Sequence, residues 1–409
     1  MNQIRIRNLL LVSLVAETIC ASYGLVLGEQ ASVISICYLI AGLVFIVSVL
    51  FFPEAQLPTA KDLKKGGLIK LILLLLMVVL AYITARYWLD LIPIDPDFAD
   101  MLPVIKVMNE RFLQGQWRQV YEPIPQIWHG TQPIYLPAMW MPYAGALFLG
   151  VDMRWVTVGA ILLSFTGILG LVRLVKNSYF GWLQLALAAL LFWWIFARNE
   201  VHNLVSMSEE GVIIFYFVLL TVAIISRNIY FMAVATSLCI LSRYSMIGWV
   251  IPCLIFLYLA KEYRRLIIFM VTGIFFFLFF FYIPFGFKTL EEMFALPGNY
   301  VAFANFVWKT TPEVFWLNLG MAKFFGPHHT ALLHHTLLIL SFLIPLLFMC
   351  FCLLQKKWKL HNVNLACFKL SILVFYQFID VPYGYLFYTA SFVSMVVASA
   401  LLKGLTVDG

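Results

Sequence analysis

Charged residues are scarce in this sequence. Asp, Glu, Lys and Arg make up 11% of its 409 residues, whereas an ordinary soluble domain has about a quarter. Hydrophobic residues make up 63% of the chain, and apolar runs of about twenty residues recur, each long enough to cross a hydrocarbon core as a helix. Helices are favoured there because lipid offers no partner for an unpaired backbone N–H or C=O group. This composition excludes a soluble globule.

Strict alternation of apolar and polar residues is also missing. A membrane β-barrel needs alternating strands, and runs such as Leu71–Leu80 are apolar throughout. The sequence therefore predicts an all-α polytopic membrane protein of about 11 to 13 transmembrane helices. The thirteen predicted spans are 9–27, 32–52, 68–89, 134–150, 155–174, 180–197, 211–226, 229–242, 246–260, 266–286, 331–354, 363–380 and 384–402. Residues 1–409 are treated as one transmembrane domain.

Cysteine is absent from the long polar segments. All seven cysteines lie in or beside apolar runs, so no disulfide framework is expected, and Cys350 with Cys352 is not a zinc pattern. The sequence has no Asn-x-Ser/Thr sequon, which favours a bacterial inner (cytoplasmic) membrane over the endoplasmic reticulum. The first apolar run, Leu9–Leu27, is long for a signal peptide and predicts a retained helix.

The net charge of +7 comes from short basic clusters between the apolar runs. We interpret them as cytoplasmic anchors rather than a nucleic-acid surface. The clusters are Arg5/Arg7, Lys61/Lys64/Lys65, Lys261/Arg264/Arg265 and Lys356/Lys357/Lys359. This orientation places two long loops, 90–133 and 288–330, outside, where amphipathic helices such as Asp97–Gln114 are expected to lie on the membrane. Strict alternation leaves one span too many or too few within 134–260, so one segment there is either re-entrant or wrongly split.

Three carboxylates open the first outer loop. Asp95, Asp97 and Asp100 follow the span that ends near Leu89. On spacing alone, a solvated loop start with Asp97 capping the next helix explains them well. Pro96 fixes the directions of its two neighbours, which favours a site.

These residues resemble the first outer loop of GT-C glycosyltransferases, closest to the mannosyltransferases that use polyprenyl-phosphate mannose. The resemblance rests on Asp95-Pro96-Asp97-Phe98, on Gly115 and Tyr121, and on the stretch Thr131–Tyr143. The chain departs from that family where Gly115 and Tyr121 stand six apart and where Leu136-Pro137-Ala138 replaces the usual Pro-Leu. The specific match covers a single segment, the first outer loop and the start of the following helix.

The resemblance implies a polyprenyl-phosphate sugar donor, a glycan, lipid or protein acceptor with a free hydroxyl, and transfer at the outer membrane face. Asp97 aligns with the family's general base, and Asp95 would orient the acceptor or help to hold a metal. Asp100 and Tyr135 are assigned to substrate binding. Some members of the superfamily use a divalent cation and others do not, so the metal ligands stay unknown.

The departing phosphate needs positive charge. Arg243, alone in an apolar stretch, is the first candidate, and a snorkelling arginine is the alternative. Arg198 and His202 share a helix face and come second, with an ordinary polar hairpin as the alternative. His129 is a candidate sugar contact. A metal site at the histidines of 328–335 lacks a recognised ligand spacing.

Other classes of membrane protein are alternatives to this enzyme. A transporter or flippase for a lipid-linked glycan usually shows internal repeats and helices interrupted near the midplane. The sequence shows no such repeat, and its carboxylates are expected at the membrane surface. A glycan ligase would be expected to depend on arginines in a late loop rather than on early aspartates. Glu17 and Asp380 lie within predicted spans, so each is expected to have a buried partner or a wet cavity.

Overall fold

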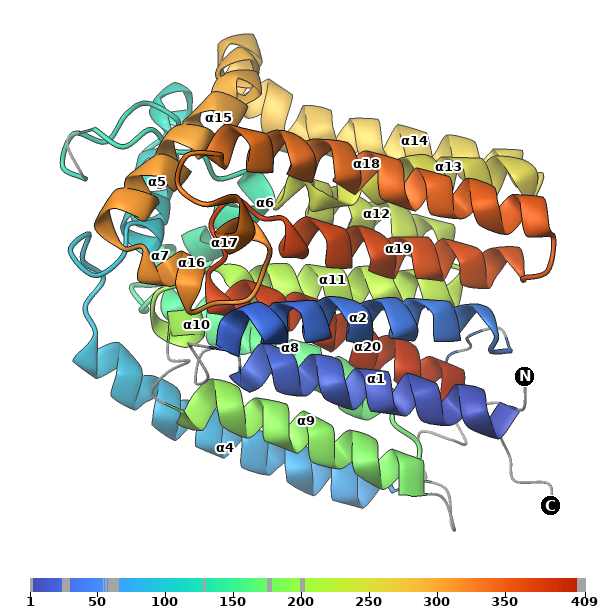
Figure 1. Cartoon of the computed structure of the whole chain (residues 1–409). Helices are drawn as coiled ribbons and strands as arrows, with labels where there is room; N and C mark the ends of the chain where they lie inside the picture. Colours follow the sequence, from blue (N-terminus) through green and yellow to red (C-terminus); the bar gives the residue numbers. More distant parts are fainter. Residues whose placement is uncertain are drawn as a thin grey trace.

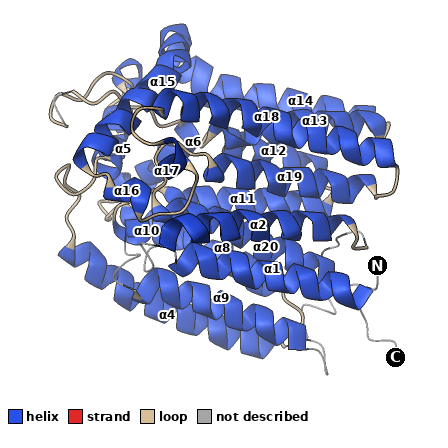
Figure 2. Cartoon of the chain, in the orientation of Figure 1, coloured by secondary structure: helices blue, strands red, loops and turns tan. Residues whose placement is uncertain are grey.

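The computed structural model describes residues 3–23, 30–53, 55, 57, 66–127, 130–174, 179–198 and 203–402. Every regular element in these ranges is a helix, and one isolated β-bridge joins Ile124 to Thr131. The long helices run side by side in one bundle (Figure 1), and the same view shows the predominance of helix (Figure 2). The chain is an all-α polytopic membrane protein, as the sequence predicts.

Seven of the described helical segments are long and apolar enough to cross a membrane. They are α2 (Ala31–Leu50), α4 (Gly67–Leu91), α8 (Arg154–Leu171), α9 (Tyr179–Ala197), α14 (Tyr263–Phe277) with its continuation to Phe287, α18 (Thr330–Gln355) and α20 (Tyr388–Leu401) with the preceding turn from Gly384. Shorter apolar helices complete the bundle: α11 (Glu210–Ser226), α12 (Ile229–Ile240) and α13 (Ile247–Leu259). Two further helices, α1 (Gln3–Tyr23) and α19 (Leu360–Gln377), pack against α2.

The predicted span 134–150 is wrong. This segment is broken into α6 (Pro137–Trp140), a 3-10 turn (Met141–Tyr143) and α7 (Ala144–Phe148). Pro137 and Pro142 lack a backbone N–H and prevent one long helix. The pieces instead pack beneath α5 (Met101–Leu113), where the Asn109 amide donates to the Trp140 carbonyl over 3.0 Å.

Removing that span resolves the alternation problem. Five helices, α8, α9, α11, α12 and α13, now separate the first outer loop from Lys261. The first outer loop lies on the side opposite to the N-terminus, so five further crossings bring the chain back to the N-terminal side. The positive-inside rule expects Lys261 on that side. In Figure 1 the short helices α5, α6, α7 and α10 (Asn203–Ser206) gather at one end of the bundle, and the start of α1 and the end of α20 lie at the other.

The first outer loop folds onto the bundle. The predicted amphipathic helix is present as α5, which buries Leu102, Ile105 and Met108. The Tyr121 hydroxyl donates to the Tyr135 carbonyl over 3.0 Å. These contacts turn the loop into a packed cover over the bundle's outer end.

The second outer loop begins without a break from the bundle. A π-helical turn (Leu278–Tyr282) joins α14 to α15 (Ile283–Thr310), which bends at Gly286. Gly286 has φ +82°, and a Cβ there would collide with the Arg118 guanidinium. Two short helices follow, α16 (Glu313–Trp316) and α17 (Ala322–Phe325). The predicted span 266–286 thus merges into the outer-loop helix.

Glu17 has the buried partner that its position requires. The Lys369 ammonium of α19 donates to Glu17 Oε1 over 2.5 Å, and neither side chain is exposed. The Ser394 hydroxyl donates to the other carboxylate oxygen, and Lys369 also reaches the Ala390 carbonyl. This pair joins α1, α19 and α20, and removing either partner alone would leave an uncompensated charge in the bundle.

Candidate functional site

A cavity of about 720 Å³ opens between the outer ends of the helices. Arg243 follows the end of α12 and His334 lies near the start of α18, which fixes the cavity at the end covered by the outer loops. Its polar lining includes Asp100, Glu209, Arg243, His334 and Asp380, together with Tyr135, Tyr244, Tyr300, Tyr383 and Tyr385. Its apolar lining includes Ile240, Ile247, Phe277, Phe281, Leu338 and Phe342. A single cavity therefore offers both charged and hydrocarbon-like surfaces.

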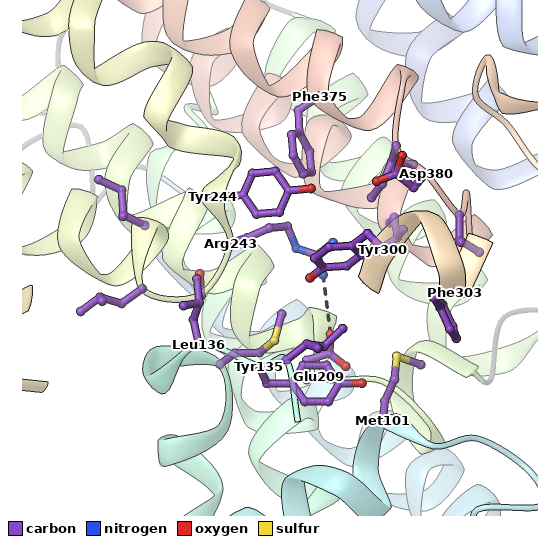
Figure 3. A pocket seen from close by; sticks show the side chains of 18 of the residues that line it. Met101, Tyr135, Leu136, Glu209, Arg243, Tyr244, Tyr300, Phe303, Phe375 and Asp380 are labelled. Atoms are coloured by element: carbon purple, nitrogen blue, oxygen red, sulfur yellow. Dashed lines mark ion pairs between the residues drawn. The ribbon is translucent and has the colours of Figure 1, made fainter. Parts of the chain in front are cut away.

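Arg243 reaches this cavity because the helix breaks there. After α12 ends at Ile240, Arg243 is extended (φ −153°, ψ 128°) and a 3-10 turn (Tyr244–Met246) leads into α13. In Figure 3 its side chain and that of Asp380 enter the cavity from opposite sides. Only 12% of the Arg243 side chain is exposed, so it is not a snorkelling arginine.

Two glutamates hold the guanidinium of Arg243. Its Nη2 lies 2.6 Å from Glu210 Oε2 and 3.6 Å from Glu209 Oε1. The second oxygen of the Glu210 carboxylate accepts from the Tyr376 hydroxyl at 2.9 Å and from the Thr389 hydroxyl at 2.7 Å. Both carboxylate oxygens of Glu210 are therefore engaged, and the residue holds the Arg243 side chain in position.

Several polar atoms around the cavity lack a partner in the described structure. Arg243 Nε and Glu209 Oε2 are buried and make no hydrogen bond. The same holds for His334 Nε2, Asp380 Oδ1 and the hydroxyl of Ser341. Buried polar groups are normally paired, and each unpaired one carries a free-energy penalty. These five atoms belong to residues that line one cavity, where a ligand could pair with them, so the cavity is a candidate ligand site.

Asp100 is the loop carboxylate that faces the cavity. Burial raises its pKa to about 6, and the nearby Glu209 charge adds to the shift. Tyr135 is buried in the same wall. A carboxyl with such a pKa exchanges a proton readily near neutral pH.

Asp95 and Asp97 lie outside the cavity lining. The Asp97 backbone N–H donates to Asp95 Oδ1 over 2.9 Å, so Asp95 closes a tight turn. Asp97 itself is exposed, and α5 begins only at Met101. The structure therefore separates the three loop aspartates: two form a surface turn and Asp100 points inward.

The remaining sequence candidates are scattered. Arg198 stacks over the Trp194 ring at 4.7 Å and is not among the cavity residues. His202 and His129 lie outside the described residues. Among the histidines of α18 and its start, His334 alone belongs to the cavity lining.

His334 and Asp380 form a pair that the sequence did not assign. His334 Nδ1 lies 2.7 Å from Asp380 Oδ2, although the two residues are 46 positions apart. The lone acidic residue in an apolar span was the available signal, because such a residue requires a partner. Glu209 and Glu210, adjacent at the start of an apolar run, gave a similar signal that was missed. In the described ranges no group of three or more His, Cys, Asp or Glu side chains is arranged to hold a metal.

A scan against protein-family models finds no match to this chain, and a search of curated proteins finds none either.

Proposed function

We propose that this chain is a GT-C-type glycosyltransferase that moves a sugar from a polyprenyl phosphate to an acceptor hydroxyl at the extracytoplasmic face, in a bacterial inner membrane. The observation that carries the proposal is the divided lining of the cavity. Acidic and tyrosine side chains suit a sugar, while the isoprenoid chain of the donor matches the apolar residues. A fully polar or fully apolar substrate would leave one half of the lining without a partner.

Arg243 is the group proposed to bind the donor phosphate. The Nε of Arg243 has no hydrogen-bond partner, whereas its Nη2 donates to the Glu210 carboxylate, which holds the side chain in place. A guanidinium can donate two parallel hydrogen bonds to phosphate oxygens. Positive charge at the departing oxygens stabilises the transition state.

Asp100 is proposed as the general base in place of Asp97. The acceptor oxygen attacks the anomeric carbon, its proton passes to the Asp100 carboxylate, and the bond from the sugar to the phosphate oxygen breaks. The electron pair of that bond leaves with the lipid phosphate, so no general acid is required. The support for Asp100 is its place in the cavity lining and its pKa of about 6.

Transfer assays with the purified protein test this proposal. A panel of polyprenyl-phosphate sugars would be offered with glycan, lipid and protein acceptors, with and without a chelator to detect a divalent cation. Asp100→Asn should lower transfer by roughly 10²–10⁴-fold, the usual contribution of a general base. Asp97→Asn is the matched control and should transfer like the unmodified protein.

Two results would contradict the proposal. If Asp97→Asn is the inactive variant, the base is on the surface turn and the cavity assignment fails. If the protein binds lipid-phosphate sugars but moves them across the bilayer without transfer, it is a transporter or flippase.

A further inference from the structure

The pair of His334 and Asp380 is not used by the reaction described above. Their side chains are 3% and 5% exposed, and His334 Nδ1 is engaged by the carboxylate. The other ring nitrogen, Nε2, is buried without a partner on a residue that lines the cavity. The Tyr300 ring stacks against the imidazole with centroids 6.5 Å apart. The imidazole is therefore fixed in orientation with one nitrogen left for a ligand.

His334 stands where the lining changes from polar to apolar. Leu338 and Phe342 follow it at four-residue intervals on α18, and both line the cavity. Residues at this spacing share one helix face, and eight residues span about 12 Å. The α18 wall thus runs from an imidazole near the outer end to hydrocarbon side chains deeper in the bundle.

Arg243 marks the same boundary on the opposite wall. Ile247 lies four residues after it and belongs to the apolar lining. Tyr300 lies between the two walls, because its ring is 6.2 Å from that of Tyr244 and 6.5 Å from His334. A lipid phosphate belongs at such a boundary, since its tail is apolar and its sugar is polar.

Arg243 alone is a weak anion site. Its charge is shared with Glu210 at 2.6 Å and with Glu209 at 3.6 Å. A phosphate in this cavity needs a further donor, and charge-assisted hydrogen bonds are the strong ones. Asp380 leaves room for one: an imidazole ring with a hydrogen on each nitrogen donates from Nδ1–H to the Asp380 carboxylate and offers Nε2–H to a second acceptor.

We propose that His334 is a second phosphate-binding residue, whose Nε2–H donates to a phosphate oxygen of the lipid-linked donor opposite Arg243. Asp380 is a positioning residue that holds the imidazole through Nδ1. This inference rests on the proposed function and adds the group that anchors the phosphate on the α18 wall.

Binding of farnesyl phosphate to the full chain in detergent tests the inference, with farnesol as the phosphate-free probe. The unmodified protein should bind farnesyl phosphate more tightly than farnesol. His334→Asn should weaken farnesyl phosphate binding by roughly ten- to hundredfold, as expected for a hydrogen bond to a charged group. Farnesol binding should not change.

Three further variants make the test specific. His335→Asn alters the exposed neighbour on the same helix and should bind both probes normally. His334→Gln keeps an amide donor near the place of Nε2 and should retain part of the affinity. Asp380→Asn keeps an acceptor for Nδ1 but loses the charge, so it should show an intermediate loss.

The outcomes separate this inference from the proposed function. If the unmodified protein prefers farnesyl phosphate and His334→Asn and His334→Gln keep the full preference, His334 is not a phosphate ligand and the proposed function stands. If the unmodified protein does not prefer farnesyl phosphate over farnesol, both proposals fail together.

Discussion

Arg243 has one face toward glutamates and the other toward the cavity. The short contact with Glu210 fixes its direction, and the unpaired Nε is left for a ligand. Lysine could replace the charge but not the planar fork that holds two oxygens. The identity of the cation therefore matters at this position as well as its charge.

Substitutions at Arg243 should separate these two contributions. Arg243→Lys should keep some transfer, whereas Arg243→Ala should lose nearly all of it and bind donor more weakly, because Glu209 and Glu210 lose their counter-charge. Turnover and donor affinity of the purified variants measure the effect. Arg227→Ala, at the exposed end of α11, is the control and should behave like the unmodified protein. Normal transfer by Arg243→Ala would remove this arginine from the site.

If Asp100 is the general base of the proposed transfer, the reaction has a defined pH dependence. Burial raises its pKa to about 6, and the base must be deprotonated to accept a proton. As the pH falls through about 6, kcat/KM should therefore drop roughly tenfold per pH unit. A profile of kcat/KM from about pH 4.5 to about pH 8 measures this dependence. An acid limb that persists in the residual activity of Asp100→Asn would belong to another group.

At the scale of elements, the contact of α13 with α18 shapes the cavity. Pro345 has no N–H, so the Ser341 carbonyl lacks its usual partner four residues on. Gly248 packs directly against that carbonyl: a Cβ at this glycine would lie 2.1 Å from the Ser341 oxygen. Both Gly248 and Ser341 line the cavity. The close approach of these helices is possible only without a side chain at 248.

Gly248→Ala should therefore push α13 away from α18. We expect the free energy of unfolding to fall by roughly 1–3 kcal/mol, as for other overpacked positions. Farnesyl phosphate binding should also be weaker. Thermal unfolding in detergent and a binding titration measure the two effects. Gly273→Ala on α14 is the matched control, because a Cβ there meets nothing within 4 Å. Equal behaviour of the two variants would show that the helix contact does not set the cavity.

For the whole molecule, the basic residues and the parity of the helices agree on one orientation. The start of α1, the turn between α13 and α14 and the loop after α18 share one side, and α5 with the cavity lies on the other. Within the part of the chain that the structure describes, seven helices of spanning length make this arrangement polytopic. The lipid-linked donor is accordingly expected at the outer leaflet.

Cysteine labelling of cells tests this orientation. Gln116→Cys, in the first outer loop, should react with a membrane-impermeant thiol reagent from outside. Lys357→Cys, between α18 and α19, should react only after the membrane is permeabilised. Both positions are exposed on the protein surface, so accessibility alone does not distinguish them. The reverse pattern would invert the topology and remove the proposed site from the outer face.

The sequence by itself determined the class of protein and most of its helices. Twelve of the thirteen predicted spans correspond to helices, because a run of apolar residues in lipid has few alternatives to the helix. The exception, 134–150, is also a largely apolar segment but contains Pro137 and Pro142. Hydropathy reports that a segment is buried, and it does not report whether lipid or protein covers it.

Only the tertiary structure decided which polar residues meet. Asp97 and Asp100 are three positions apart in one loop, yet the turn closed by Asp95 leaves one exposed and the other in the cavity. His334 and Asp380 come from different helices, as do Arg243 and Glu210. Spacing along the chain fixes neighbours on one helix, whereas the packing of helices sets contacts between them. The site is therefore a property of the packed bundle.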